Sequence, residues 1–253
     1  MRLFLHELRA QQLLFWRNRE AAFFSFLFPI ILLVLLGSVY GDEPIEGVKA
    51  STFLLVGLLG YGVAATAFAS LAITLVVRRE QGLLKRVRGT PLSPATYLSA
   101  VIASMVVVIG LQVVAQLLVG RYLLDADWPA APVEFAVVVL FGSAAFAALG
   151  VAITAFVRSS DGSSAIVNAI YLPMAFISGA FFSTEDMPAF LEAISKVLPL
   201  THLLDLIRAT FIEGDGLADS AGALLAVAVW GLAGLAIAVR RFRWEPREGM
   251  GTA

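Results

Sequence analysis

The side chains that usually carry out catalysis are sparse in this sequence. The chain has two histidines and no cysteine, and no HExxH motif brings His6 or His202 next to a carboxylate. Its three lysines, Lys49, Lys85 and Lys196, all lie outside any GxxxxGK[ST] motif, so the chain does not bind ATP through a P-loop. The serine pairs at 159–160 and 163–164 have no histidine nearby to activate them. We therefore predict a protein that is not an enzyme and holds neither a metal nor a cofactor.

The composition predicts an all-α membrane protein with one membrane domain over residues 1–253. Of the 253 residues, 59% are hydrophobic and 15% are charged, whereas a soluble domain carries about 25% charged residues. Six blocks almost free of charge are each near or above the roughly 20 residues that a membrane-spanning helix needs. They cover residues 21–41, 49–77, 95–120, 135–157, 162–184 and 220–239. Because the interiors of these blocks carry no ionisable side chain, transport driven by an ion gradient is disfavoured.

The basic residues predict the orientation of these six spans. If the six blocks cross in turn, 14 of the 18 lysines and arginines fall on one side. The positive-inside rule then places both termini in the cytoplasm, which makes the chain a multi-pass protein of the cytoplasmic membrane. The net charge of −1 is uninformative by itself, and no nucleic-acid partner is predicted. The uninterrupted apolar blocks make the lipid bilayer the predicted environment.

Two segments are predicted to be helical without spanning. In residues 1–20, apolar side chains share roughly one helical face, the pattern of a helix in the cytoplasmic interface: Phe4, Leu5, Leu8, Phe15 and Trp16. An ordinary basic leader is the alternative. In the outer segment 185–219, residues 188–198 and 203–212 predict two short helices that re-enter the outer leaflet, are broken at Pro199 and pair Asp205 with Arg208. A small capping domain is the alternative there.

Polar residues inside three of the blocks suggest a path through the membrane. Thr66, Ser70 and Thr74 recur every four residues after Gly62, and Gln112 and Gln116 share one face of the third block. In the fifth block, Asn168 and Tyr171 lie just before Pro173, which predicts a kink. Packing between helices is the simpler explanation of these residues, and lining a substrate path is the alternative.

The cytoplasmic loop 78–93 is the most informative stretch. Its sequence predicts a short helix with a strip of Leu83, Leu84 and Val87, flanked by basic residues and stopped by Pro91. Such a helix would fit a groove on another protein. A basic loop that only stops transfer would explain the charges but not the ordered run from Glu80 to Leu92.

This loop resembles the first coupling helix of type-2 ATP-binding cassette (ABC) exporters, in the membrane subunit of those systems. Residues 78–93 carry an R-x-E-x-G-x-L run followed by TPL-S, and Phe28-Pro29 is similar to the family's F-P signature. Residues 178–182 read SGAFF and are followed by MP at 187–188, PLT at 199–201 and Arg208, similar to the signature after the fifth span. Ser183 stands where many members have proline. The resemblance covers nearly the whole chain.

The resemblance implies a permease of six spanning helices that works as a homodimer or heterodimer with two copies of a cytoplasmic ABC ATPase subunit. It assigns coupling to the ATPase to residues 78–93, with a second, smaller contact at 158–161 and the N-terminal helix resting on the same subunit. The implied coupling residues are Glu80, Gly82, Leu83, Leu84, Val87, Thr90 and Pro91. The implied outer gate consists of Phe181, Phe182, Pro199 and Arg208 within and before the outer segment.

From this resemblance we expect a permease that moves a hydrophobic or amphiphilic compound, drug-like or lipid-like, out of the cell. A separate subunit would hydrolyse the ATP. The alternative is a membrane scaffold or sensor that does not transport and recruits a cytoplasmic partner through the basic loop.

Overall fold

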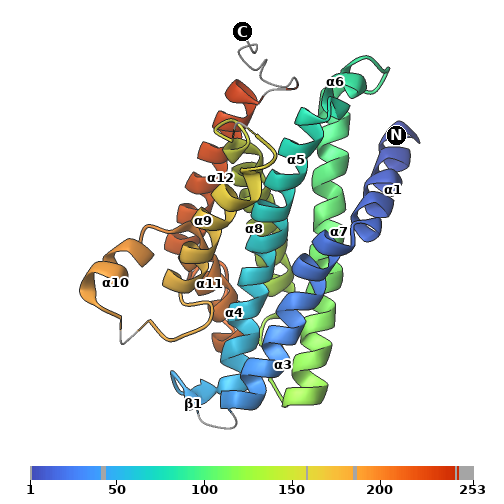
Figure 1. Ribbon diagram of the computed structural model, residues 1–253. Coiled ribbons are helices and arrows are strands. Elements are labelled where there is room, and N and C mark those ends of the chain that lie inside the picture. Colours follow the sequence, from blue (N-terminus) through green and yellow to red (C-terminus); the bar gives the residue numbers. More distant parts are fainter. Residues whose placement is uncertain (1, 41–43, 158, 185–186, 243, 245–253) are drawn as a thin grey trace.

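The structure is a computed structural model that describes residues 2–40, 44–157, 159–184, 187–242 and 244. It is a bundle of helices with their long axes roughly side by side (Figure 1). The chain enters the bundle through four consecutive helical segments: α1 (Arg2–Arg17), α2 (Arg19–Ala22), the π-helical η1 (Phe23–Leu27) and α3 (Phe28–Tyr40). A small antiparallel hairpin of β1 (Pro44–Ile45) and β2 (Val48–Lys49) follows, which the sequence did not predict.

The central helix of the bundle runs without interruption from Ala50 to Glu80, as α4 (Ala50–Ala64), the π-helical η2 (Ala65–Ser70) and α5 (Leu71–Glu80). The remaining elements are α6 (Leu83–Arg88), α7 (Pro94–Leu124), α8 (Pro132–Ile153), α9 (Ser163–Ile177), α10 (Ala189–Ser195), α11 (Pro199–Arg208), η3 (Ala209–Glu213) and α12 (Ala221–Arg241). In the apolar stretch of the central helix 94% of residues are buried, against 22% in the first span and 17% in the last. The central helix is therefore the core, and α3 and α12 present most of their apolar surface outward.

Five helices in the described residues are long and apolar enough to cross a membrane, which confirms a multi-pass helical membrane protein. The fifth predicted span, residues 162–184, is different. Its helix α9 has 15 residues, about 22 Å at the α-helical rise, while the hydrocarbon core is about 30 Å thick. The helix stops because Ser178 ends it and Gly179, at φ +78°, turns the chain through a left-handed conformation.

Apart from the turn after α9, the connections between the long helices lie alternately at the two ends of the bundle (Figure 1). Helix α6, the end of α12 and the start of α1 all lie at one end of the bundle (Figure 1). There the ring of Trp244, just beyond α12, lies 6.3 Å from that of Tyr97 on α7. At the other end the β1–β2 hairpin contacts the α7–α8 connection through Lys49 and Asp125. The basic residues of α6 and of the last turn of α12 lie at the α6 end.

Outer segment 185–219 contains two short helices, as predicted, but their bounds differ. Proline 199 starts α11 at its first turn, where the missing N–H costs nothing, rather than breaking a helix. The second helix runs on through η3 to Glu213. One face of α11 is fully buried: Leu200, Leu203, Leu204, Leu206 and Ile207. Asp205 and Arg208 form the predicted pair, with 3.9 Å between carboxylate and guanidinium.

The N-terminal segment forms the predicted helix, and it packs along α7. Only part of the predicted apolar face is buried or half-buried, namely Phe4, Leu8 and Phe15, and polar Gln11 is buried with them. Leu5 and Trp16, predicted on that face, are exposed. Gln12 reinforces the contact, because its amide donates to the backbone oxygen of Ser104 at 2.8 Å.

Candidate functional site

The loop that resembles a coupling helix contains a helix shorter than predicted. The sequence predicted a helix from Glu80 to Pro91, whereas α6 covers Leu83–Arg88 and Glu80 is the last residue of α5. Gly82 adopts φ +68° between the two helices, a conformation that glycine takes without strain. The sharp turn separates the loop into the end of α5, α6 and the following 89–93 segment.

The apolar strip of α6 is not free for a partner. Leu84 is fully buried and Val87 packs against the core, while Leu83 is 39% exposed. The side chains of Lys85 and Arg86 are exposed beside Leu83. Leu84 and Val87 thus hold α6 against the bundle, and the exposed surface of the predicted strip is Leu83 with its basic neighbours.

Thr90 and Pro91 continue this exposed surface beyond α6. The hydroxyl of Thr90 donates to the Val87 carbonyl at 2.7 Å and accepts from the Leu92 N–H at 3.3 Å. Ser93 then caps α7, because its hydroxyl accepts the N–H of Thr96 at 3.1 Å. The TPL-S run is thus a structured connection between two helices.

Glu80 makes its contacts inside the chain. Hydrogen bonding from the hydroxyl and the backbone N–H of Ser160, in the turn between α8 and α9, lowers the pKa of the Glu80 carboxyl. The Ser160 hydroxyl also lies 3.5 Å from the carboxylate of Asp161. The two cytoplasmic connections implied as ATPase contacts, residues 78–93 and 158–161, are therefore bonded to each other; Arg158 itself lies outside the described residues.

Arg78 and Arg79 hold the end of α5 in place, a role that the sequence did not predict. The guanidinium of Arg79, 4% exposed, donates to the carbonyls of Thr154 at 2.8 Å and Val157 at 2.6 Å. Arg78 donates to the amide oxygen of Gln11 at 2.6 Å and to the hydroxyl of Tyr97 at 3.0 Å. No spacing in the sequence signals the Arg79 contact, because its partners are backbone atoms.

Three of the predicted path residues form one buried network between the central helix and α7. The Thr66 hydroxyl donates to the amide oxygen of Gln112 at 3.2 Å, and the Gln112 amide donates to that of Gln116 at 3.3 Å. All three side chains are fully buried. Gly62 permits the close approach, because a Cβ there would lie 1.7 Å from the Gln112 amide nitrogen.

The other path candidates are not part of this network. Ser70 and Thr74 are half-buried, whereas Thr66 is fully buried. The difference has a structural cause, since η2 spans Ala65–Ser70 with a wider turn than an α-helix and shifts the four-residue repeat off one face. On α9, Asn168 is half-buried, and the Tyr171 hydroxyl donates to the carbonyl of Tyr61 at 3.2 Å.

The predicted outer-gate residues meet around the turn after α9. Phe181 is buried with its ring 5.1 Å from that of Tyr61, while Phe182 is 47% exposed. The turn packs directly on α4, because a Cβ on Gly57 would lie 1.9 Å from the Ala180 carbonyl oxygen.

Arg208 comes to the same turn from α11. Its guanidinium donates to the Gly179 carbonyl at 2.8 Å and lies 5.3 Å from the centre of the Phe53 ring. Pro199, at the start of α11, is buried. The structure therefore brings Phe181, Phe182 and Arg208 to one turn and leaves Pro199 at the far end of α11.

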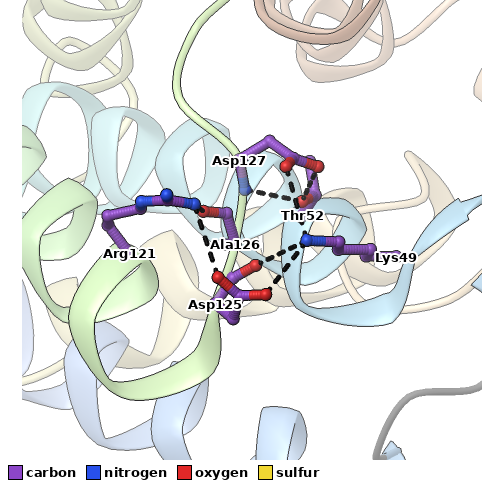
Figure 2. Close-up of polar contacts among 6 residues, drawn as sticks. All are labelled: Lys49, Thr52, Arg121, Asp125, Ala126 and Asp127. Atoms are coloured by element: carbon purple, nitrogen blue, oxygen red, sulfur yellow. Dashed lines mark hydrogen bonds and ion pairs between the residues drawn. The ribbon is translucent and has the colours of Figure 1, made fainter.

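A polar cluster joins the two connections at the opposite end from α6 (Figure 2), and we call it the outer cluster after the predicted orientation: Lys49, Thr52, Arg121, Asp125 and Asp127. Lys49 lies 3.2 Å from Asp125 and 3.6 Å from Asp127, and Arg121 lies 3.4 Å from Asp125. The hydrogen bond with Asp125 raises the pKa of the Lys49 ammonium. Buried Thr52 bonds Asp127 twice, donating to its carboxylate and accepting its backbone N–H, each at 3.0 Å.

A bundle of span-length apolar helices whose connections alternate between two ends is the fold of a multi-pass membrane protein. The model of the ABC-2 type transporter family matches residues 2–212. The chain belongs to the ABC-2 type transporter family and is a membrane transport permease, a transport subunit rather than a catalytic one. Membership implies partnership with an ATP-binding subunit.

Curated relatives from distant organisms match over most of the chain. The putative transport permease YvfS of Bacillus subtilis is 26% identical over 74% of this chain and 76% of the relative. Nodulation protein J of Rhizobium leguminosarum bv. viciae is 27% identical over 73% of this chain and 72% of the relative. The putative transport permease ycf38 of Porphyra purpurea is 25% identical over 79% of this chain and 70% of the relative.

Proposed function

We propose that the protein is the membrane subunit of an ABC exporter that moves a hydrophobic or amphiphilic compound, drug-like or lipid-like, outward. The observation that carries the proposal is the surface at the α6 end of a chain in the ABC-2 family. The exposed residues there are Leu83, Lys85 and Arg86 on α6, which Leu84 holds against the core, and Pro91 just beyond the helix. An apolar side chain ringed by cations suits an acidic groove on a soluble partner.

In this proposal each permease binds one cytoplasmic ATPase subunit, and two permeases, identical or different, assemble with two ATPases. Both termini lie in the cytoplasm at the α6 end, and the protein resides in the cytoplasmic membrane. The basic residues at that end support this orientation.

The proposal keeps six crossings, with the outer segment completing the fifth. Helix α9 starts beside Ser160 and ends at the turn that packs on Gly57. Gly57 is seven residues past Ala50, the first residue of α4, so the turn lies about 10 Å short of the start of α4. In this proposal α10 and α11 fill the remaining depth as a re-entrant segment. The fully buried face of α11 supports this role.

The proposed path follows the surface that η2 and α9 share, where half-buried Ser70, Thr74 and Asn168 are the candidates. Thr66, Gln112 and Gln116 would act in this scheme by holding the central helix against α7. Phe181, Phe182 and Arg208 would gate the outer exit, with the buried ring of Tyr61 beneath them.

The test combines purification with transport. We expect the protein, isolated from its native membrane, to carry a P-loop ATPase subunit in equal amount, and Arg86→Glu to remove it. Arg240→Glu, an exposed charge reversal on α12 at the same end, is the matched control and should retain the ATPase. Inside-out vesicles should accumulate an amphiphilic dye only with hydrolysable ATP. Purification without any ATPase, or dye uptake independent of ATP, would contradict the proposal.

A further inference from the structure

The last three residues of α5 contact several neighbouring parts of the molecule. We refer to these residues, Arg78, Arg79 and Glu80, as the α5 bracket. Successive residues of an α-helix point about 100° apart, so three in a row diverge around the helix axis. Arg78 contacts α1 and α7, Arg79 contacts the end of α8, and Glu80 contacts the turn before α9. The end of α5 is thereby bonded to four neighbouring elements.

Arg79 is placed where a helix end needs donors. The last carbonyls of a helix have no partner within it, and they carry partial negative charge. The two carbonyls that Arg79 satisfies, on Thr154 and Val157, bracket the unwound turn that follows α8. Thr154 and Val157 are each 1% exposed, so these bonds are shielded from water. A planar guanidinium spans both oxygens at once, which a lysine ammonium cannot do with the same geometry.

Glu80 extends the connection to the start of α9. Ser160 donates to Glu80, and the carbonyl of the same Ser160 accepts from the hydroxyl of Ser163 at 2.7 Å and its N–H at 3.0 Å. Ser163 is the first residue of α9 and is fully buried. The α5 bracket therefore holds both sides of the 159–161 turn.

We propose that the α5 bracket joins α6 and the 159–161 turn into one composite surface for the ATPase, with Arg79 as the residue that positions the turn. This inference rests on the proposed function. Exposed Ser159 and Asp161 then face the partner together with Leu83, Lys85 and Arg86. Movement of the ATPase would displace α5, α8 and α9 as a unit rather than act through two independent contacts.

Site-specific cross-linking tests this surface, and the absence of cysteine in the chain makes each introduced thiol unique. Thr90→Cys reports the first connection and Ser159→Cys reports the turn; both positions are exposed. In native membranes, each should cross-link to the ATPase subunit through a short bifunctional reagent. Adding Arg79→Lys should lower the yield at position 159 about fivefold, the effect of losing one hydrogen bond, and leave the yield at position 90 unchanged.

Ser160→Ala provides a second variant that removes the hydroxyl, which bonds Glu80 and lies 3.5 Å from the Asp161 carboxylate, and leaves the Ser160 carbonyl in place. It should lower the position-159 yield in the same direction by a smaller factor. Arg240→Gln, exposed at the same end of the bundle, should change neither yield. Ser160 is half-buried in a turn, so we expect Ser160→Ala to fold and to provide the test even if Arg79→Lys does not fold.

The outcomes separate this inference from the proposed function. If neither cysteine of the otherwise unchanged protein cross-links to an ATPase, the proposed function is wrong. If both cross-link and neither Arg79→Lys nor Ser160→Ala alters the ratio of the two yields, the permease contacts its partner as proposed but the α5 bracket does not position the turn. A selective loss at position 159 in either variant supports the inference.

Discussion

The two ends of the bundle are both held by charged side chains, but in opposite ways. At the α6 end, Arg79 is 4% exposed and donates to two backbone carbonyls. At the other end, the side chains of Lys49 and Asp125 pair while 50% and 80% exposed. A buried guanidinium is costly to place and stabilises only with all its bonds made, while exposed pairs contribute little and adjust easily. The comparison predicts a rigid end beside the proposed ATPase surface and an adaptable end beside the proposed exit.

Thiol accessibility should divide the two ends completely, and it is the largest effect that we predict. With a membrane-impermeant reagent, Ser159→Cys should react only after the membrane is opened, and Asp125→Cys should react in intact cells. We expect this because, in the predicted topology, 14 of the 18 lysines and arginines lie on the same side of the membrane as residue 159. Labelling of both positions from the same side would show that the connections do not alternate across the membrane.

Arg79→Ala should destabilise the protein more than any substitution in the outer cluster. Two buried carbonyls lose a charge-assisted partner, so we expect the free energy of unfolding to fall by about 3 kcal/mol. Denaturation of the purified protein in mixed micelles measures it. The control Arg240→Ala, on an exposed side chain at the same end, should leave stability unchanged; equal losses would mean that burial of Arg79 is not what matters.

Thr52→Val should have the largest effect within the outer cluster, because Thr52 is its buried member at 2% exposed. Valine keeps the shape of threonine but cannot make the two bonds to Asp127. We expect a loss of about 1–2 kcal/mol in the same denaturation assay. Thr74→Val, at a half-buried position of α5, serves as the control for the change of side chain. A larger loss than that of Arg79→Ala would reverse the ranking of the two ends.

Lys49→Gln should have the smallest effect. Its ammonium is solvated, and its contacts with Asp125 and Asp127 are screened by salt. Any difference in unfolding midpoint between the variant and the parent protein should vanish on going from low to high ionic strength. A difference that persists at high salt would indicate a structural role for Lys49 that exposed ion pairs do not have.

The apolar blocks predicted most of the fold, because the need to satisfy backbone groups in lipid leaves only helices. Block 95–120 became α7 and block 220–239 became α12 with small changes at the ends. Block 162–184 contains a shorter helix than predicted, because Gly179 turns the chain inside an apolar run. Composition alone does not show where such a helix stops. The β1–β2 hairpin was missed because four paired residues leave no pattern.

The candidate site was predictable in place but not in detail. The run from Glu80 to Leu92 located the loop, yet nothing in it indicated that Glu80 bonds Ser160 or that Leu84 belongs to the core. Such contacts join residues far apart in the chain, and a single sequence holds no record of them. The repeat of Thr66, Ser70 and Thr74 assumed a regular α-helix, an assumption that η2 breaks.

The π-helical η2 has a consequence for the direction in which the α5 bracket points. A wide turn accommodates one residue more than an α-turn, and one residue corresponds to about 100° of rotation about the helix axis. The angular phase of Arg78, Arg79 and Glu80 is therefore set by the residue count within Ala65–Ser70, in the middle of the central helix. If that turn became a regular α-helix, α5 would rotate about its own axis, and Arg79 would no longer face the end of α8.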